Sequence, residues 1–420
     1  MRNGQKTAWI SRLCLSLAVL LALGSGTGAA LAAEPQGAVD EFKLVALGDS
    51  ITAGYEPGAD VNTVPYGYVD RLYEQALLHG RASVSNYGIV GLKSMGLKAF
   101  TEAAAAGKSL TGEEIQASLP DPRVNALGAA TAQLRAELAT ADAAAITIGG
   151  NDVAPLLTSA SSLTDDELNK QVAAMLEQYN VNVTASIDAL LAINPALRIV
   201  IADQYQPAPV LAGKDLYEKL NKATAAFTAN LDALAATYAA KGVKVEAVHV
   251  AKQFSGREGM LTYMVSKRDF HPTQAGYAVI AAAFGNVLWG SYSELAAPVV
   301  GAPMSIYVGG KQLNTPYKPV LKNSVNYVAI QDIVNAVGAT TVWDSKTSTA
   351  NIKFGTRTVG VKLGASTVMV DGAAVKVSSP AYMQKVGKEG KTYVPLATVA
   401  GGLGFSVVYS SKLKTVFINP

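Results

Sequence analysis

Along residues 40–290, short continuous apolar runs alternate with segments in which apolar residues recur at helical spacing. Short apolar runs typical of buried strands occur at 44–47, 82–87, 143–148, 197–202 and 243–250. Between them, apolar residues three and four positions apart predict helices, beginning with the stripe Val69, Leu72, Tyr73, Ala76 and Leu77. Further helices are predicted over 124–139, 216–240 and 274–288, and a capping box of Thr164 and Glu167 opens one that runs to about residue 191. Strands that alternate with helices predict a three-layer α/β/α sandwich with a mostly parallel sheet.

Polar or glycine-rich clusters follow several of these strands. Gly48-Asp49-Ser50 ends the first, Asn86 to Gly91 follows the second, and Gly149-Gly150-Asn151-Asp152 ends the third. Arg268-Asp269-Phe270-His271-Pro272 precedes the last helix. Alone, Gly-Asp-Ser reads equally well as an ordinary turn. Because the carboxyl ends of parallel strands share one edge of the sheet, the clusters are expected to converge there. We expect a helix to begin at Ile51, which would leave unpaired N–H groups beside Ser50.

These residue types suit acyl transfer. A serine hydroxyl is a weak nucleophile until a neighbouring base such as histidine takes its proton. The tetrahedral intermediate carries a negative charge, and backbone N–H groups or an asparagine amide can stabilise that charge. The nucleophile elbow of α/β-hydrolases is absent, since it requires a glycine where Thr52 stands.

The motif blocks resemble the GDSL, or SGNH, hydrolase superfamily of esterases, lipases, thioesterases and carbohydrate deacetylases, over roughly residues 40–290. The resemblance implies a flavodoxin-like fold with Ser50 as nucleophile and His271 as general base. It also implies an oxyanion hole made by the backbone N–H groups of Ser50 and Gly91 and the side-chain amide of Asn151.

The sequence departs from this superfamily at the acid. In the superfamily the acid usually stands three residues before the histidine, in an Asp-x-x-His pattern. In this chain that position is Arg268, and the nearest carboxylate, Asp269, is two residues before His271. Asp269 could reach His271 through a shifted loop, a backbone carbonyl could orient the imidazole instead, or the site could be impaired. An acid that only orients the imidazole can be replaced with partial activity retained.

Other residues near the motifs have weaker readings. Val153, Leu156 and Leu157 could form a wall that binds an acyl chain, and Tyr205-Gln206-Pro207 could line the pocket or form a turn. Residues 95–120 read as a surface helix or as a covering segment over the substrate. His79 reads as the last residue of a helix and His249 as a structural residue in a strand.

The first 32 residues read as a secretory signal peptide. Arg2, Lys6 and Arg12 precede the apolar stretch 13–23, and Ala30-Leu31-Ala32 fits a cleavage site. The apolar stretch is short for a membrane anchor. Cys14 lies in this segment, so the mature chain would have no cysteine and therefore no disulfide. The mature chain would also be formally neutral, which gives no indication of binding to nucleic acid or to an anionic surface.

Beyond Trp289 the composition changes. Residues 291–303 read as a linker, and residues 304–420 contain a duplicated unit in which 326–330, 337–339 and 342–346 match 392–396, 403–405 and 408–412. Upstream, 308–310 corresponds to 370–372. Each copy reads as strands, a short helix and a hairpin, which makes a smaller α+β domain. This half is similar to the N-terminal domain of copper amine oxidases. No histidine or cysteine follows His271, so imidazole or thiolate metal ligation is unavailable there. Tyr307, Tyr317, Trp343, Tyr382 and Tyr409 could stack on sugar rings, although buried packing is the expected fate of most.

Together these features predict a secreted serine ester hydrolase that could be associated with the cell surface, with no cofactor or metal and a non-catalytic C-terminal domain. Lipid-like or short-chain carboxylic esters and O-acetyl groups on cell-wall or plant polysaccharide are the two open substrate classes. The C-terminal domain could contact the cell wall or carbohydrate; neither nucleic acid nor a transmembrane segment of the mature chain is expected. A surface-binding protein that keeps the hydrolase fold only as a scaffold is the non-enzymatic alternative.

Overall fold

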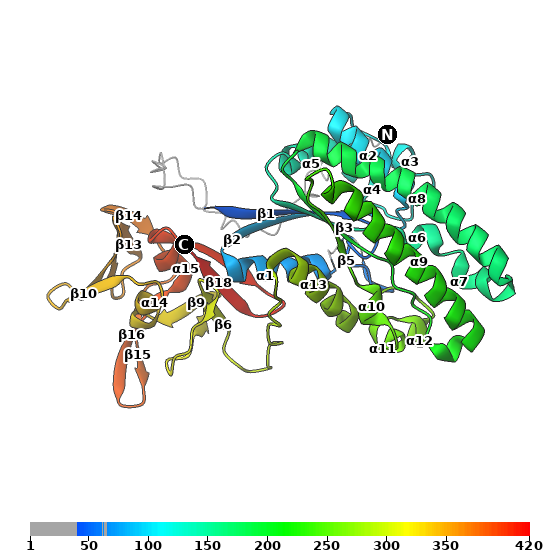
Figure 1. The fold of residues 1–420 in the computed structure, drawn as a ribbon. Helices are drawn as coiled ribbons and strands as arrows, with labels where there is room; N and C mark the ends of the chain where they lie inside the picture. The colour runs from blue at the N-terminus through cyan, green and yellow to red at the C-terminus, as the bar shows by residue number, and fades with distance from the viewer. Residues whose placement is uncertain (1–39, 61, 63–64) are drawn as a thin grey trace, which may run out of the picture. The chain divides into compact units, whose positions relative to one another are not determined.

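The computed structural model describes residues 40–60, 62 and 65–420. The predicted signal peptide at 1–32, with Cys14, lies outside the described residues. The described chain forms two compact units (Figure 1). The first contains residues 42–75 and 82–294, and the second contains residues 76–81 and 295–420.

The first unit is built on a five-stranded sheet in the order β2-β1-β3-β4-β5. The strands are β1 (Glu41–Gly48), β2 (Arg81–Gly88), β3 (Ala143–Thr147), β4 (Arg198–Ala202) and β5 (Val245–Val248). β3 pairs in parallel with β1 and with β4, and β4 pairs in parallel with β5. The predicted α/β fold with a mostly parallel sheet is therefore confirmed. In this order the chain reverses its direction of winding at β1 and β3, and doubly wound folds bind ligands at such a point.

Helices cover both faces of this sheet (Figure 1). One face packs against α2 (Ser94–Ala106), α5 (Thr131–Leu138), α8 (Asp165–Ile193) and α9 (Lys214–Ala239). The other packs against α1 (Tyr68–His79), α10 (Ala251–Phe254) and α13 (Gln274–Trp289). The alternation within β1 explains both layers, because Val45 and Leu47 belong to the first core whereas Leu44 and Ala46 belong to the second.

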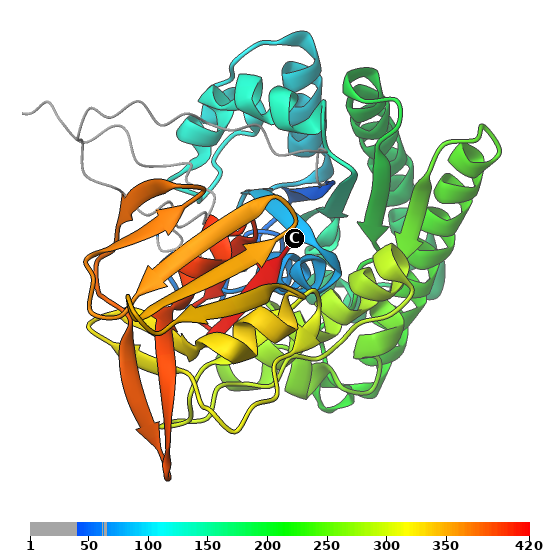
Figure 2. The same ribbon diagram turned by 90° about the vertical axis from the view of Figure 1, so that its left-hand side faces the viewer.

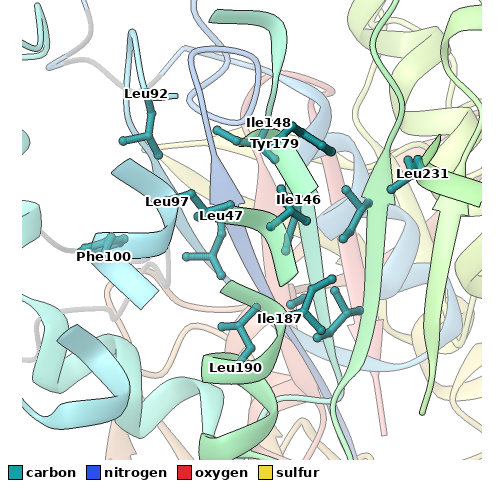
Figure 3. Packing of buried hydrophobic residues seen from close by; sticks show 14 of the residues in the cluster. Leu47, Leu92, Leu97, Phe100, Ile146, Ile148, Tyr179, Ile187, Leu190 and Leu231 are labelled. Atoms are coloured by element: carbon teal, nitrogen blue, oxygen red, sulfur yellow. The ribbon is translucent and has the colours of Figure 1, made fainter. Parts of the chain in front are cut away.

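The core on the first face holds the long helix α8 against the sheet. Figure 3 shows Leu47 and Ile146 of the sheet close to Ile187 and Leu190 of α8, all of them buried. The capping box predicted for this helix is present, since the Thr164 hydroxyl accepts the Glu167 N–H and the Glu167 carboxylate accepts the Thr164 N–H.

Three local predictions differ from the structure. Residues 124–139 form two helices, α4 (Val124–Ala129) and α5, because the backbone of Ala130 between them is not helical. The helix expected from Ile51 is a single hydrogen-bonded turn, and α1 begins only at Tyr68. The segment 95–120 is neither one surface helix nor a cover, because α2 buries Leu97 and Phe100 in the core and the short α3 (Gly112–Ile115) follows it.

The second unit is rich in strands. Its three sheets have the orders β10-β11-β12-β13-β14, β15-β16-β9-β8 and β17-β18-β6-β7. The strands are β6 (Ser305–Val308), β7 (Lys311–Gln312), β8 (Val320–Lys322), β9 (Val325–Ala329), β10 (Thr340–Asp344), β11 (Thr349–Phe354), β12 (Arg357–Lys362), β13 (Thr367–Val370), β14 (Ala373–Lys376), β15 (Tyr382–Val386), β16 (Glu389–Pro395), β17 (Ser406–Ser410) and β18 (Thr415–Asn419).

The predicted duplication is visible in this unit. The succession of β9, α14 (Ile330–Ala336), β10 and β11 recurs as β16, α15 (Leu396–Gly402), β17 and β18. The β6–β7 hairpin turns at Gly309 and Gly310, and the β13–β14 hairpin turns at the matching Asp371 and Gly372. Of the aromatic residues considered for sugar stacking, Trp343 and Tyr409 are exposed and Tyr307, Tyr317 and Tyr382 are partly buried. Among all described residues, no helix is long and apolar enough to cross a membrane.

Candidate active site

Ser50 lies in a tight turn directly after β1. The carbonyl of Asp49 accepts the N–H of Ala53, and the carbonyl of Ser50 accepts the N–H of Tyr55. The turn approaches β3 so closely at Gly48 that a Cβ atom there would lie 2.0 Å from the Thr147 carbonyl oxygen. Gly48 also has a φ of +136°, which favours glycine. The glycine of the motif is therefore required for the turn that presents the serine.

The Asp49 side chain holds this turn through two hydrogen bonds. Its Oδ1 accepts the Ile51 N–H at 3.0 Å and the Thr147 hydroxyl at 2.9 Å. Thr52 lies 2.7 Å from the same Thr147 hydroxyl and 3.0 Å from the hydroxyl of Tyr68, so the polar network continues into the core. Burial raises the pKa of Asp49 to about 7, although both hydrogen bonds oppose that shift.

His271 lies between the Ser50 hydroxyl and the Asp269 carboxylate. Its Nε2 lies 2.8 Å from Ser50 Oγ, and its Nδ1 lies 2.6 Å from Asp269 Oδ1. A carboxylate only accepts hydrogen bonds, so Nδ1 carries the proton and Nε2 is free to accept the serine hydroxyl. Tyr55 and Phe270 flank the imidazole, with ring centroids at 4.6 and 4.5 Å.

The loop before His271 explains how an acid two residues away reaches the ring. Arg268, at the position where the acid was expected, ends α12 (Met264–Lys267) with a left-handed φ of +55°. The Asp269 side chain then turns back, and its Oδ1 accepts the backbone N–H of His271 at 2.8 Å as well as the ring proton. This local turn brings the carboxylate to the imidazole. In the structure the partner of Nδ1 is thus Asp269 rather than a backbone carbonyl.

Burial governs the electrostatics of the histidine. His271 is 7% exposed, and this burial lowers its pKa below the usual 6.5, against the opposing effect of Asp269. The imidazole is therefore neutral at neutral pH. A neutral imidazole is the form that can accept a proton.

The three residues expected to donate to an oxyanion lie on three segments. Asn151, on α6 (Gly150–Val153), lines the same pocket as Ser50, and its Nδ2 donates one proton to the Leu92 carbonyl at 2.9 Å. The second amide proton remains available. Within the described part of the chain, neither the N–H of Ser50 nor that of Gly91 donates to a protein atom. Gly91 does not itself line the pocket, and a Cβ there would lie 2.7 Å from Pro120.

A polar network that sequence reasoning missed joins the Gly91 and Asn151 loops. Asp152 accepts the N–H of Ser94 at 3.0 Å and its hydroxyl at 2.6 Å, and Asn182 of α8 donates to that hydroxyl at 3.0 Å. Burial raises the pKa of Asp152. The only signal in the sequence was the position of Asp152 directly after Asn151, and nothing there pointed to Ser94.

An apolar pocket opens beside Ser50. Its cavity volume is about 60 Å³. Most of its wall is apolar and comes from α6, α7 (Leu156–Ser159), α9 and the loop after β4. The lining side chains include Val153, Leu156, Leu157, Pro207, Leu220, Ala223, Phe227 and Phe270. The predicted wall residues and the Tyr205-Gln206-Pro207 segment therefore do lie at this pocket.

The family follows from a comparison of the sequence with family models. The model of the GDSL-like Lipase/Acylhydrolase family matches residues 46–279, more than half of the chain. The chain belongs to this family. It is therefore a carboxylic ester hydrolase. In a separate comparison, no curated protein matches its sequence. A second model, the copper amine oxidase N-terminal domain, matches residues 307–418.

Solved structures similar to this GDSL-like hydrolase include three enzymes. An extracellular lipase from Streptomyces rimosus has 18% identity and a TM-score of 0.39, covering 60% of this chain and 99% of that one. A lipase from a goat rumen metagenome has 18% identity and a TM-score of 0.37, covering 58% and 95%. A family 3 carbohydrate esterase from Clostridium thermocellum has 16% identity and a TM-score of 0.34, covering 59% and 94%.

Neither of the remaining histidines lines the pocket beside Ser50. His79 is the last residue of α1, as predicted. His249 follows β5 and lies 3.6 Å from Asp203 and 3.5 Å from Asp232. Among the described residues, including those matched by the copper amine oxidase model, no group of three or more His, Cys, Asp or Glu side chains is arranged to hold a metal ion.

Proposed function

We propose that the GDSL-like hydrolase acts through an acyl-enzyme on Ser50. The observation that carries this proposal is the continuous chain from Ser50 Oγ through His271 to the Asp269 carboxylate, with distances of 2.8 and 2.6 Å. His271 takes the hydroxyl proton as Ser50 attacks the ester carbonyl, then returns it to the leaving alcohol. A water molecule, activated by the same imidazole, releases the acid. Asp269 holds the imidazole and stabilises the imidazolium that forms in each step.

The oxyanion is stabilised by donors that the resting structure leaves free. The backbone N–H groups of Ser50 and Gly91 and the second amide proton of Asn151 are the donors in this proposal. Loss of one such donor costs about 3–4 kcal/mol of transition-state stabilisation. The Asp152–Ser94 bonds hold the Asn151 segment to the chain that follows Gly91.

The pocket favours an ester with a short acyl chain. Its wall is made mainly of aliphatic and aromatic side chains, which gain from contact with methylene groups. The small cavity beside Ser50, about 60 Å³, favours a short acyl chain over a long fatty one. An O-acetyl group on a polysaccharide is the second candidate, because acetate also fits and leaves part of the apolar wall empty.

We further propose that the enzyme is secreted and works at or near the cell surface. The support is the basic, apolar and small-residue order of the first 32 residues, together with a C-terminal domain that carries no part of the proposed site.

Covalent labelling and chain-length profiling test the proposed function. A serine-directed organophosphate should label the wild type and not Ser50→Ala, whereas labelling of both would exclude Ser50 as the nucleophile. Among p-nitrophenyl esters, butyrate should be cleaved with a higher kcat/KM than acetate or laurate. Faster release of acetate from acetylated xylan than from p-nitrophenyl butyrate would favour the polysaccharide candidate.

A further inference from the structure

The charge of the chain is divided unevenly between its two parts. Residues 304–420 contain thirteen Lys and Arg but only four Asp and Glu, which gives a net charge of +9. Residues 33–303 contain 19 Lys and Arg against 28 Asp and Glu, a net charge of −9. The neutral sum for the mature chain therefore conceals a strongly basic region. Such an asymmetry is typical of a segment that interacts with a polyanion.

We propose that the outer face of the sheet β10–β14 binds an anionic, hydroxyl-rich polymer in which phosphate or carboxylate groups repeat along a polyol or glycan chain. The strands of this sheet are drawn in yellow to orange in Figure 2. One face of the sheet is buried in the core of the unit through Ala350, Ile352, Val359, Val361 and Val368. The opposite face exposes Lys353, Lys362 and Lys376. This binding goes beyond ester hydrolysis and does not depend on Ser50.

Strand register places these lysines in rows with threonine hydroxyls. Lys362 pairs with Thr349 on one side, and Thr367 pairs with Lys376. On the other side of Lys362, Val361 pairs with Val368, so Lys362 and Thr367 come next in the same register. Adjacent strands lie about 4.8 Å apart, so Lys362 and Lys376 stand roughly 10 Å apart across Thr367. Lys353 lies in a second row. An extended polymer that crosses the strands would meet alternating ammonium and hydroxyl groups.

The row of residues between these two rows carries no charged side chain. Asn351 pairs with Gly360, and Gly360 pairs with Met369. Gly360 has no side chain, and Ala374 continues the row beyond Met369. This middle row therefore separates the charged rows and offers a polymer apolar contact at the exposed Met369.

The lysines of this face keep their charge unpaired. Within the described part of the chain, none of the three forms an ion pair. Asp371 pairs instead with Arg357 at 3.0 Å. Asp344, on the edge strand, accepts the Lys346 N–H and the Thr347 hydroxyl. The positive charge of the face is thus directed to solvent.

The composition of the face favours a hydroxylated polymer over nucleic acid or a membrane. Residues 304–420 have one arginine, and Arg357 is committed to Asp371 and to the Gly402 carbonyl. Lysine acts as a point charge, whereas bidentate recognition of phosphate requires the arginine fork. The registered positions of this face hold no aromatic side chain on which bases could stack. Val342 and Met369 are its large exposed apolar residues, too few to insert into a bilayer.

Two triple variants of the full chain test the proposal. Lys353→Gln, Lys362→Gln and Lys376→Gln together remove the charge of the face. Lys311→Gln, Lys385→Gln and Lys388→Gln together remove the same charge from exposed positions outside this sheet. Binding is measured on immobilised poly(glycerol phosphate) and on immobilised polygalacturonate. Comparison of the two polymers distinguishes recognition of phosphate from recognition of carboxylate. Both variants should hydrolyse a p-nitrophenyl ester at the wild-type rate and keep the wild-type Tm, which establishes that they are folded.

The wild type should bind at least one polymer at low salt and lose it at about 1 M salt, where the screening length falls to about 3 Å. The face variant should bind about tenfold more weakly, and the control variant should stay within about twofold of the wild type. Equal losses in both variants would overturn the assignment to this face. Failure of the wild type to bind either polymer, or tighter binding to duplex DNA or phosphatidylglycerol vesicles, would overturn the proposal.

Discussion

The Oδ1 atom of Asp269 accepts two hydrogen bonds from His271, one from the backbone N–H at 2.8 Å and one from the ring Nδ1 at 2.6 Å. A single oxygen therefore shapes the loop and orients the imidazole. The bond to the backbone N–H turns the Asp269 side chain back toward the ring. A carboxylate two residues before the histidine can therefore reach Nδ1, although the acid usually stands three residues before it. Arg268, which takes the usual position of the acid, has a left-handed backbone with a φ of +55°.

Replacement of this acid should impair catalysis. Asp269→Asn keeps the size of the side chain but no longer stabilises the imidazolium, so kcat should fall about a hundredfold or more while KM changes little. Steady-state kinetics on p-nitrophenyl butyrate measure both. Arg268→Asn is the matched control, since asparagine tolerates a left-handed φ, and it should keep activity within about twofold. A loss of less than about tenfold in Asp269→Asn would remove this residue from the catalytic group.

The pH dependence should report the buried histidine. Since burial lowers the pKa of His271 below 6.5, kcat/KM should rise with pH through a value below 6.5 and then reach a plateau. Asp269 raises this pKa, so Asp269→Asn should move the rise to still lower pH. A pH–rate profile of both proteins tests the direction of the shift. An unmoved profile in the variant would mean that Asp269 does not act on the titration of His271.

Asn151 should contribute to the transition state rather than to substrate binding. Asn151→Ala removes a proposed oxyanion donor, and kcat should fall about 10²–10³-fold with KM nearly unchanged. Asn180→Ala is a control on α8, because Asn180 bonds to Asn230 and takes no part in the proposed site. Thermal unfolding of both variants separates catalysis from the lost bond to Leu92. A rise in KM with unchanged kcat would place Asn151 in ground-state binding instead.

Asp49 should make the stability of the fold depend on pH. The folded chain keeps this proton up to about pH 7, whereas an unfolded chain releases it near 3.8. Its contribution is therefore full below pH 3.8 and is lost as the pH rises toward 7, by at most about 4 kcal/mol. Asp49→Asn retains an oxygen that can accept from Ile51 and Thr147. The variant should gain stability over the wild type as the pH rises from about 4 to 7 in denaturant titrations, and a constant difference would contradict the shift.

The sequence was most informative where one residue type is tied to one backbone geometry. Gly48 and the run after β3 marked the edge that carries the candidate site, because strand ends in a parallel sheet meet there. The capping box of Thr164 located the start of α8 to the residue. The duplicated C-terminal motifs likewise appear as matching strands and helices, since hairpin turns constrain the residues between strands.

Other features depend on contacts that no local pattern records. The turn that contains Ser50 is held by a hydrogen bond from Thr147, nearly a hundred residues away, to Asp49. The helix predicted to begin at Ile51 does not form. The geometry of Asp269 depends on the φ of Arg268, which its sequence does not reveal. The Asp152–Ser94 bond likewise joins α6 to the first residue of α2, which are distant in the chain.

The depth of the pocket should set the acyl-chain preference, and Ala223 is the position at which this can be tested. Ala223 is buried in α9 and lines the pocket with Phe227 and Leu156. Ala223→Leu should fill the cavity and lower kcat/KM for p-nitrophenyl butyrate about tenfold more than for acetate, since a pocket distinguishes each methylene by about 1–3 kcal/mol. Ala225→Leu adds the same group on the exposed side of the same helix and should leave the ratio of the two esters unchanged. If Ala223→Leu slowed both esters equally, the acyl chain would bind elsewhere.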